Sequence, residues 1–366
     1  MDEKLKAFLL LNYINADLRC WNKFLKFNVA PFELWKNTAN FVGSVLSEGA
    51  AERLIEAERR GFAEKELADC AASSVELLMY GAEGYPEPLY DLKDAPLLLY
   101  IQGRDRTIPG NTVGVVGTRR ATAYGKLVAY NIGNRAAAEN IAVISGGASG
   151  IDGQAHLGCC NAHGKTFAVF GTGIDVIYPL SNRELFESIK ENGAVISEFP
   201  LGSAGEAWHF PRRNRIVAAL SKRLAVIEAP AKSGSMITAK LCLELGREIW
   251  AVPGRITEQA AEGTNKLIFD GAYPLVSMDL FFGNNAVQID FDKLPETNSL
   301  MSKLTEEQKK VFKVIAREND MTVDNIAVAA DMPATDVLKI TAMLDALGLI
   351  AASGPGRYTT AKTAIK

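Results

Sequence analysis

The sequence of 366 residues is poor in the residue types that cross-link small proteins or bind metals, with only five Cys and three His. No two cysteines are spaced as C-x-x-C, and the adjacent residues Cys159 and Cys160 have a poor geometry for a mutual disulfide. We therefore expect reduced thiols in a cytoplasmic protein. We also expect no structural metal site, because such sites need closely spaced Cys and His ligands.

Long hydrophobic runs and an excess of one charge are lacking as well. The apolar run nearest the start, 8–11, is too short for a signal peptide or a membrane span, which predicts no membrane partner. The chain has 40 Lys and Arg against 43 Asp and Glu, so any site for a polyanion must come from local clusters. Two segments carry several cations and no acid, 113–126 and 209–223.

Short apolar runs alternate with helical patterns in the middle of the chain. The runs lie at 113–117, 141–145, 166–171, 194–197, 224–229 and 248–254. Continuous apolar strands separated by helices predict a parallel sheet covered on both faces. Such sheets bind ligands at the carboxyl ends of their strands.

The two ends of the chain have other patterns. Residues 1–80 show the apolar spacing of helices, whereas 84–110 is rich in Pro, Gly and Asp and contains one short strand candidate, 97–101. A polar, irregular segment at 277–303 predicts a linker. Residues 304–366 then show a helix capped by Thr305, a helix–turn–helix and a Gly/Pro hairpin, the pattern of a winged-helix domain.

Three predicted strand-to-helix turns carry the residues that bind anions. Backbone N–H groups at a helix N-terminus, and glycines that allow close approach, form such sites. The candidates are Gly117, Thr118, Arg119 and Arg120 in the first turn, Gly146 and Gly147 in the second, and Lys232, Ser233, Gly234 and Ser235 in the third. One such turn is ordinary, but three at one edge favour a bound anionic ligand.

Each of these turns also has a plainer interpretation. Arg119 and Arg120 could be a solvated pair, and the glycines could serve only tight turns. Asp152 and His156, four residues apart on one predicted helix, could be a catalytic pair or could hold the turn by a local hydrogen bond.

The stretch HFPRRNRIVAALS, 209–221, combines an aromatic ring with a dense group of cations. Cations beside aromatic faces are the pattern of single-strand recognition, where charge and base stacking both contribute. Its candidate residues are Phe210, Arg212, Arg213, Asn214 and Arg215, with Trp208 as a second aromatic face. The alternative is that both aromatic residues belong to the core and the arginines pair with carboxylates.

Two nucleotide-binding motifs are incomplete. A P-loop ending at Lys165 would need glycine at 159, which is Cys159, and the dinucleotide fingerprint beginning at Gly171 has Val176 in place of its third glycine. We therefore expect no bound cofactor.

Residues 84–276 closely resemble the bacterial DNA-processing protein A (DprA/Smf) family. The matching segments follow the family's order: YPEPLYDLKDAPLLLYIQG, VGTRRATAYG, SGGASGIDGQAH, VFGTGIDVIYP, SEFPLG, FPRRNRIVAALS, EAPAKSGSMITA, GREIWAVPG and GTNKLIFDGA. The resemblance implies a single-stranded DNA-binding protein that forms a homodimer and loads the RecA recombinase onto incoming strands during natural transformation. It also implies that the protein is not an enzyme.

The resemblance also implies the fold and the roles of individual residues. The fold class is α/β, an extended Rossmann-like, doubly wound, mainly parallel sheet (84–276) flanked by a small SAM-like helical domain (1–83) and, after the linker 277–303, a winged-helix domain (304–366). The family's DNA-binding positions carry over to Arg119, Gly146, Gly147, Phe210, Arg212, Arg213, Arg215, Lys232 and Gly234. Two positions depart from the family: Thr118 stands where Ser is frequent, and Arg213 is an additional cation.

Two further functions remain open alternatives. Nucleotide-processing enzymes of the lysine-decarboxylase-like phosphoribohydrolase type resemble this sheet, but their helical carboxylate is replaced here by Ala239 and Lys240. The winged-helix domain could instead read duplex DNA. Its expected recognition helix, 333–346, carries Asp336, Lys339 and Asp345, so we predict a protein contact or a weak accessory role.

Overall fold

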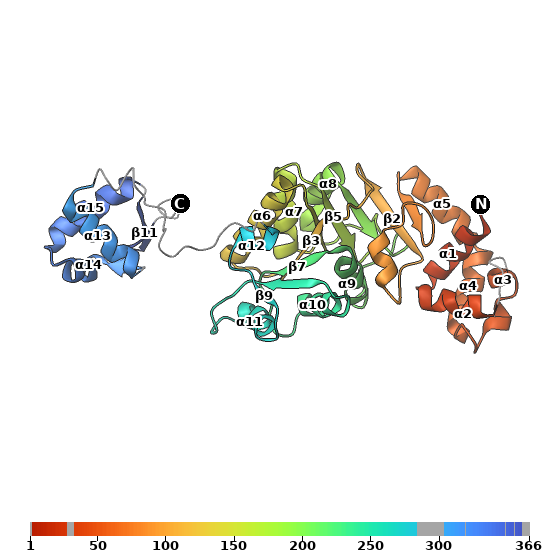
Figure 1. The fold of residues 1–366 in the computed structure, drawn as a ribbon. Coiled ribbons are helices and arrows are strands. Elements are labelled where there is room, and N and C mark those ends of the chain that lie inside the picture. The colour runs from red at the N-terminus through yellow and green to blue at the C-terminus, as the bar shows by residue number, and fades with distance from the viewer. Residues whose placement is uncertain are drawn as a thin grey trace. The chain divides into compact units, whose positions relative to one another are not determined.

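The computed structural model describes residues 2–27, 33–283, 304–318, 320–347, 349–354 and 356–360. The chain divides into two compact units, Met1–Asn285 and Ala286–Lys366. The first contains a nine-stranded sheet with helices, and the second contains a three-stranded sheet with helices (Figure 1). Among the described residues, no helix has both the length and the apolar character needed to span a membrane.

The first unit begins with short helices, as the spacing of their apolar residues predicts. Side-chain oxygens of Asp2, Asp17 and Ser47 accept hydrogen bonds from first-turn N–H groups and so cap three of them. The helices are α1 (Glu3–Tyr13), α2 (Leu18–Lys26), α3 (Glu33–Lys36), α4 (Glu48–Arg59) and α5 (Phe62–Ala72), with a 3₁₀ turn at Thr38–Phe41.

The helical pattern does not extend to residue 80. Residues Glu76–Met79 form strand β1, which pairs antiparallel with β2 (Leu98–Gly103). Leu78 is buried in this pairing. Residues 76–79 form a strand because β2 supplies backbone hydrogen-bond partners, and the spacing of apolar residues within 76–79 does not show this partner.

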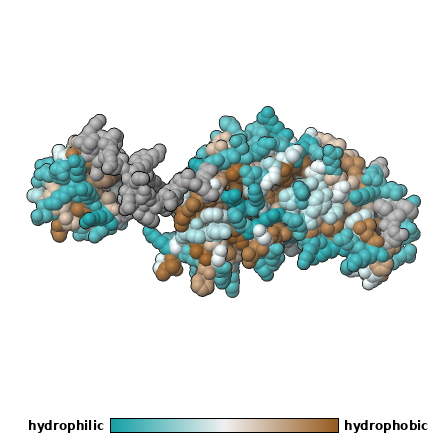
Figure 2. Space-filling model, viewed as in Figure 1, coloured by the Kyte–Doolittle hydropathy of each residue, from teal (hydrophilic) through white to brown (hydrophobic). Residues whose placement is uncertain are grey.

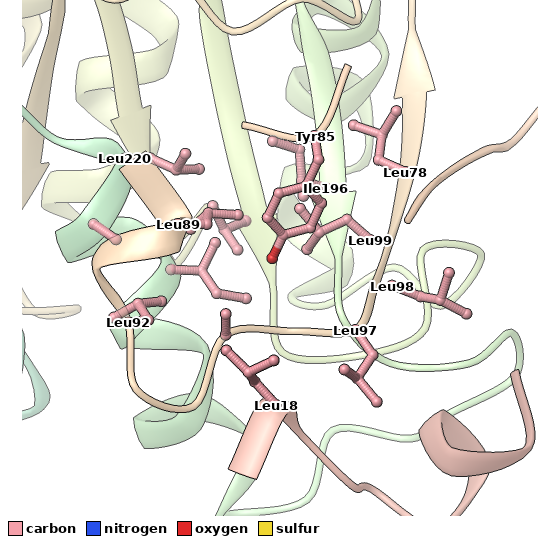
Figure 3. Packing of buried hydrophobic residues seen from close by; sticks show 14 of the residues in the cluster. Leu18, Leu78, Tyr85, Leu89, Leu92, Leu97, Leu98, Leu99, Ile196 and Leu220 are labelled. Carbon is pink, nitrogen blue, oxygen red and sulfur yellow. The ribbon is translucent and has the colours of Figure 1, made fainter. Parts of the chain in front are cut away.

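The N-terminal helices and the sheet share one hydrophobic core. Figure 3 shows Leu18 of α2 in one cluster with Leu89, Leu92, Leu97 and Ile196 of the sheet. The N-terminal helices and the sheet contribute side chains to the same cluster. Burial of this apolar surface therefore holds the helices against the sheet.

The central sheet has the order β1-β2-β6-β5-β4-β3-β7-β8-β9. All its pairings are parallel except β1 with β2 and β2 with β6. The remaining strands are β3 (Thr112–Val116), β4 (Ala142–Ser145), β5 (Thr166–Phe170), β6 (Ala194–Ser197), β7 (Arg223–Val226), β8 (Glu248–Ala251) and β9 (Tyr273–Pro274). This confirms the predicted α/β, mainly parallel architecture.

Helices cover both faces of the sheet, as predicted. Side chains from α6, α7 and α12 pack in one cluster with Val113 of β3. Side chains from α9 and α10 pack in another cluster with Leu224 of β7. The two groups of helices lie on opposite faces of the sheet (Figure 1). These helices are α6 (Ala123–Ala138), α7 (Ile151–Asn161), α8 (Arg183–Asn192), α9 (His209–Leu220), α10 (Gly234–Glu244), α11 (Glu262–Phe269) and α12 (Met278–Phe282). Short 3₁₀ turns lie at Glu87–Asp91, Leu180–Asn182 and Gln259–Ala261.

The order of the strands places a switch point beside β3. The chain passes from β3 through β4 and β5 to β6, then returns to place β7 on the other side of β3. Helices therefore leave the carboxyl end of β3 and its neighbours toward opposite faces, and a crevice opens between them.

The predicted linker 277–303 is structured at its start. Helix α12 buries Phe281 and Phe282, and Phe281 contacts the Trp250 ring edge to face with centroids 5.7 Å apart. The rest of the predicted linker, 284–303, lies outside the described residues.

The second unit has the helices and hairpin predicted for a winged-helix domain. A capping box between Thr305 and Gln308 starts α13 (Glu306–Arg317), followed by α14 (Val323–Ala330) and α15 (Ala334–Ala346). The strands β10 (Met321–Thr322), β11 (Ile350–Gly354) and β12 (Arg357–Thr360) form a sheet in the order β10-β12-β11. Its own core includes Val311, Ile326 and Leu344.

Candidate functional site

A cavity of about 780 Å³ lies at the carboxyl ends of β3, β4 and β7. We call it the switch-point cavity. It is lined by the turns that follow these three strands and by the first half of α9. The predicted site residues that it brings together are Gly117, Thr118, Arg119, Arg120, Gly146, Phe210, Arg213, Asn214, Ser233, Gly234 and Ser235.

The turn after β3 places two free cations in the cavity wall. Arg119 and Arg120 are exposed, and within the described ranges neither has a carboxylate partner. The turn itself is held by Glu228, whose backbone oxygen accepts a hydrogen bond from Thr118 N at 2.7 Å. The Glu228 carboxylate accepts from Thr122 N at 2.9 Å and from the Thr122 hydroxyl. This carboxylate is therefore occupied in shaping the turn.

The turn after β4 leaves no room for a side chain at Gly146. A Cβ there would lie 2.5 Å from Nη1 of Arg213. Gly147 is buried and has a φ of +67°, which favours glycine. Its predicted role as a phosphate site has less support than that of Gly146, because Gly147 is not part of the cavity lining.

Asp152 and His156 each have a partner of their own. Asp152 Oδ2 accepts a hydrogen bond from Gly146 N at 3.1 Å, which is the local, turn-holding interaction foreseen as one alternative. His156 Nδ1 lies 2.7 Å from Thr166 Oγ1, and burial lowers the pKa of His156 to about 3. Asp152 therefore holds the turn after β4, whereas His156 joins α7 to the first residue of β5.

Helix α9 presents an aromatic ring to the cavity. Phe210 is half-buried, with the guanidinium carbon of Arg119 5.3 Å from its ring centre and the Tyr178 ring 5.4 Å away. A second hollow of about 50 Å³ adjoins the ring and is lined in part by Tyr178 and Pro179. Tyr178 was not among the predicted site residues, although the VFGTGIDVIYP segment that contains it matches the family.

Arg213 lies beneath the cavity surface. It is 5 % exposed and donates hydrogen bonds to the backbone oxygens of Gly146 and Val169. Burial lowers the pKa of Arg213 to about 10, and the nearby Asp152 carboxylate opposes that shift. The guanidinium thus stays charged at neutral pH and holds the turn after β4 against α9.

Arg212 and Arg215 do not join the cavity, which corrects the picture of a single arginine cluster. Successive residues of a helix are about 100° apart, so these two side chains face away from Arg213. Both bind the Glu198 carboxylate, with Arg212 Nη2 3.0 Å from Oε1. Pairing with a carboxylate was the alternative foreseen for these arginines, and it applies to these two.

The turn after β7 opens helix α10 toward the cavity. Ser233 is the N-cap residue, its buried hydroxyl has no hydrogen-bond partner among the described residues, and Gly234 has open space around its Cα. The first N–H groups of α10 can therefore receive an anion. Lys232 is exposed beside this turn but lies outside the cavity lining.

Trp208 also lies outside the lining. Its ring packs edge-on against His209, with centroids 4.1 Å apart, and its Nε1 donates to Glu206 at 2.6 Å. Of the two aromatic residues proposed for base stacking, the structure places only Phe210 at the cavity.

Two carboxylates beside the cavity, Asp152 and Glu228, accept hydrogen bonds from the turns. Burial raises the pKa of Asp152, a feature shared by many catalytic acids, although Arg213 partly offsets it. Asp152 accepts a hydrogen bond from Gly146 N, and Glu228 accepts from Thr122, so both carboxylates hold backbone turns beside the cavity. Within the described ranges, no group of His, Cys, Asp and Glu is arranged to hold a metal ion.

Comparison with known proteins identifies the family of the chain. The model of a family described as DNA recombination-mediator protein A matches residues 76–284. The DNA processing protein DprA of Bacillus subtilis is 36% identical over 234 residues, which is 63% of this chain and 75% of the relative. Protein Smf of Escherichia coli is 34% identical over 294 residues, which is 79% of this chain and 78% of the relative. Protein Smf of Synechocystis is 42% identical over 199 residues, 53% of this chain and only half of the relative's length.

Two solved structures share the fold at similar identity. The X-ray structure of DNA processing protein A from Streptococcus pneumoniae has a TM-score of 0.63 and 32% identity, covering 75% of this chain and 93% of the other. The DNA processing protein A from Helicobacter pylori, studied for its single-stranded DNA binding mode, has a TM-score of 0.53 and 31% identity. The match covers 57% of this chain and 94% of the other. Together with the family match over more than half of the residues, these similarities show that the chain belongs to the DNA recombination-mediator protein A family.

Proposed function

We propose that this chain binds single-stranded DNA in the switch-point cavity and acts as a recombination mediator. In this role it protects incoming strands and loads the RecA recombinase onto them during natural transformation. Two comparisons support the proposal: the name of the family, and the single-stranded DNA binding mode described for the H. pylori relative.

One observation carries the proposal. The same cavity combines two arginines without carboxylate partners in the described structure, the open N-terminus of α10 and the half-buried ring of Phe210. Cations and N–H groups neutralise phosphates, and an aromatic ring can stack on a base. A duplex reader instead needs a broad basic face, and the chain has a net charge of −3. A thin, flexible strand fits this concentrated arrangement.

We assign the cavity residues distinct roles. Arg119, Arg120 and the N–H groups at Ser233–Ser235 contact phosphates, and Phe210 stacks on a base. Gly117, Thr118 and Gly146 allow the backbone to approach the strand, Asn214 joins α9 to α10 through its bond to Gly234 O at 3.2 Å, and Arg213 supports the floor. Lys232 contacts the strand outside the cavity.

We further propose that the chain works as a homodimer. Large apolar side chains are exposed near β9, the edge strand at one end of the sheet, where Figure 2 shows brown surface. They include Ile256 (93 % exposed), Phe269 (89 %) and Val276 (66 %). Exposed apolar residues gathered at a sheet edge are typical of protein–protein contacts. We expect light scattering to give the mass of two chains for the unsubstituted protein and of one chain for Phe269→Asp. A mass of one chain for both proteins would contradict a dimer at this edge.

The experiment for DNA binding is fluorescence anisotropy of the full chain with a dT oligonucleotide and a matched duplex across a salt series. If Arg119, Arg120 and Lys232 each neutralise one phosphate, log K against log salt should have a slope of about −2 for the single strand, from roughly 0.7 per contact. We expect the duplex to bind more weakly. Equal affinity for both nucleic acids would contradict the proposal, and a screen of nucleoside monophosphates for release of free base would then test the enzyme alternative.

A further inference from the structure

Helix α9 has two polar faces that meet different parts of the chain. Phe210, Arg213 and Asn214 line the switch-point cavity, whereas Arg212 and Arg215 face the Glu198 carboxylate. Glu198 is 2 % exposed. A buried carboxylate needs its partners, because removal of one leaves an uncompensated charge. The ion pairs with Glu198 therefore fix the positions of Arg212 and Arg215 on the face of α9 that points away from the cavity.

The N-terminal helical segment contacts the backbone of Glu198 and the side chain of Arg212. Arg212 Nη1 donates to the backbone oxygen of Asn15 at 2.8 Å, and Asn12 Nδ2 donates to the backbone oxygen of Glu198 at 2.7 Å. Asn12 is itself buried. We call the group of Asn12, Asn15, Glu198, Arg212 and Arg215 the Glu198 clamp. It joins the end of α1, the segment after β6 and the first turns of α9.

The clamp and the cavity share a short stretch of backbone. Arg212 lies next to Arg213 in α9 and two residues after Phe210. The guanidinium of Arg213 donates hydrogen bonds to the backbone oxygens of Gly146 and Val169. A rigid helix transmits any displacement of one face to the other. The geometry of the cavity face thus depends on contacts that lie outside the cavity.

We infer that the N-terminal helices position the cavity face of α9 through the Glu198 clamp. Arg212, Arg215 and Glu198 are positioning residues for DNA binding and do not contact DNA themselves. The DNA part of this inference rests on the function proposed above. The clamp part rests only on the contacts between α1, Glu198 and α9.

Hydrogen exchange of the full chain tests the clamp without DNA. In Glu198→Gln, which keeps the shape and removes the charge, we expect the amides within 209–214, where Pro211 has none, to exchange at least about tenfold faster. Arg212→Ala is a milder variant, because this side chain is partly exposed. Arg135→Ala is the matched control: Arg135 pairs with Glu139 and Asp279 and lies near the far end of α6 from the cavity. Unchanged exchange at 209–214 in both folded clamp variants overturns the inference.

Salt-dependent binding tests the consequence for DNA. We expect Arg212→Ala to weaken binding to a dT oligonucleotide by about tenfold with the salt slope unchanged, because no phosphate contact is lost. Arg212→Lys, which keeps the charge but cannot form the bidentate pair, should recover part of the affinity. A slope shallower by roughly 0.7 would instead make Arg212 a direct phosphate contact.

The outcomes separate the two proposals. If the unsubstituted chain binds no single-stranded DNA, the proposed function fails and the DNA part of the inference fails with it, while hydrogen exchange still decides the clamp. If the unsubstituted chain binds and both clamp variants bind equally well, the proposed function stands and the inference is wrong.

Discussion

The guanidinium carbon of Arg119 lies 5.3 Å from the centre of the Phe210 ring, although the strands β4, β5 and β6 lie between the two residues in the sequence. This pairing joins the turn after β3 to the start of α9 across the mouth of the cavity. It places a cation and an aromatic face where a phosphate and its base could be bound together.

Replacement of Arg119 by Ala should reduce the salt dependence of single-strand binding. Each lost phosphate contact lowers the slope of log K against log salt by roughly 0.7. Anisotropy titrations of Arg119→Ala and of the control Arg135→Ala, which removes the same charge far along α6, would measure it. An unchanged slope in Arg119→Ala would show that this arginine does not contact a phosphate.

Replacement of Phe210 by Ala should weaken binding by about 1–3 kcal/mol if a base stacks on the ring. The salt slope should be unchanged, because no charge is removed. Trp208→Ala is the control, since Trp208 lies outside the cavity lining, and it should bind normally. A loss of folded protein in Phe210→Ala, without any effect on the binding of what remains folded, would assign Phe210 to the core.

Two glycines of the cavity should respond differently to Ala. At Gly146 a Cβ would lie 2.5 Å from the Arg213 guanidinium, so Gly146→Ala should destabilise the fold by about 1–3 kcal/mol in urea unfolding. At Gly234 nothing lies within 4 Å of the added atom. Gly234→Ala should therefore keep full stability yet lose DNA affinity, because a phosphate approaches the α10 N-terminus there. Normal affinity in Gly234→Ala would argue against a phosphate at this helix end.

The buried ring of His156 should make stability fall in mild acid. Its pKa is lowered to about 3 in the folded state, against about 6.5 in the unfolded chain. Below about pH 6.5 the unfolded state takes up a proton that the folded state refuses, so the free energy of unfolding decreases by up to about 1.4 kcal/mol per pH unit. Stability is unaffected by this group at higher pH, where the ring is neutral in both states.

Urea unfolding between about pH 7 and pH 5 would measure this dependence. We expect His156→Asn to flatten it, and the exposed residue His163 provides the control His163→Asn, which should leave it unchanged. His209, whose pKa is also lowered by burial, accounts for a remaining part of the slope. Identical slopes in the unsubstituted chain and His156→Asn would contradict the assignment.

The second unit, for which we predict a winged-helix domain, should contribute little to single-strand affinity. Helix α15 carries Asp336, Lys339 and Asp345, and Lys339 Nζ lies 3.2 Å from Asp336 Oδ1. Its charge therefore does not favour a phosphate backbone. A chain ending at residue 285, the limit of the first compact unit, should bind a dT oligonucleotide as tightly as the full chain. A large loss of affinity would make this unit part of the DNA-binding surface.

Local sequence patterns predicted the strands and turns of the cavity well. Runs such as 113–117 and 166–171 became β3 and β5, because strands buried on both faces must be continuously apolar. Strand β1 was missed since its partner, β2, lies on the other side of a turn-rich connector. Helix α12 was missed because Phe281 and Phe282 have to be buried against a sheet that the local pattern does not show.

The directions of the arginines were only partly predictable. Once α9 is known to begin at His209, helical periodicity separates Arg212 and Arg215 from Arg213. Their partner could not be identified in this way. Glu198 reaches them because the segment after β6 crosses beside α9 and α1 closes the other side.

The sequence by itself determined the family, the α/β alternation and the three glycine-bearing turns, two of which carry cations, because these depend on residue type and short spacing. Only the tertiary structure decided which cations face the cavity and which are neutralised. That outcome depends on the distances between side chains from different elements: Arg119 and Arg120 meet no carboxylate in the described structure, while Arg212 and Arg215 meet Glu198.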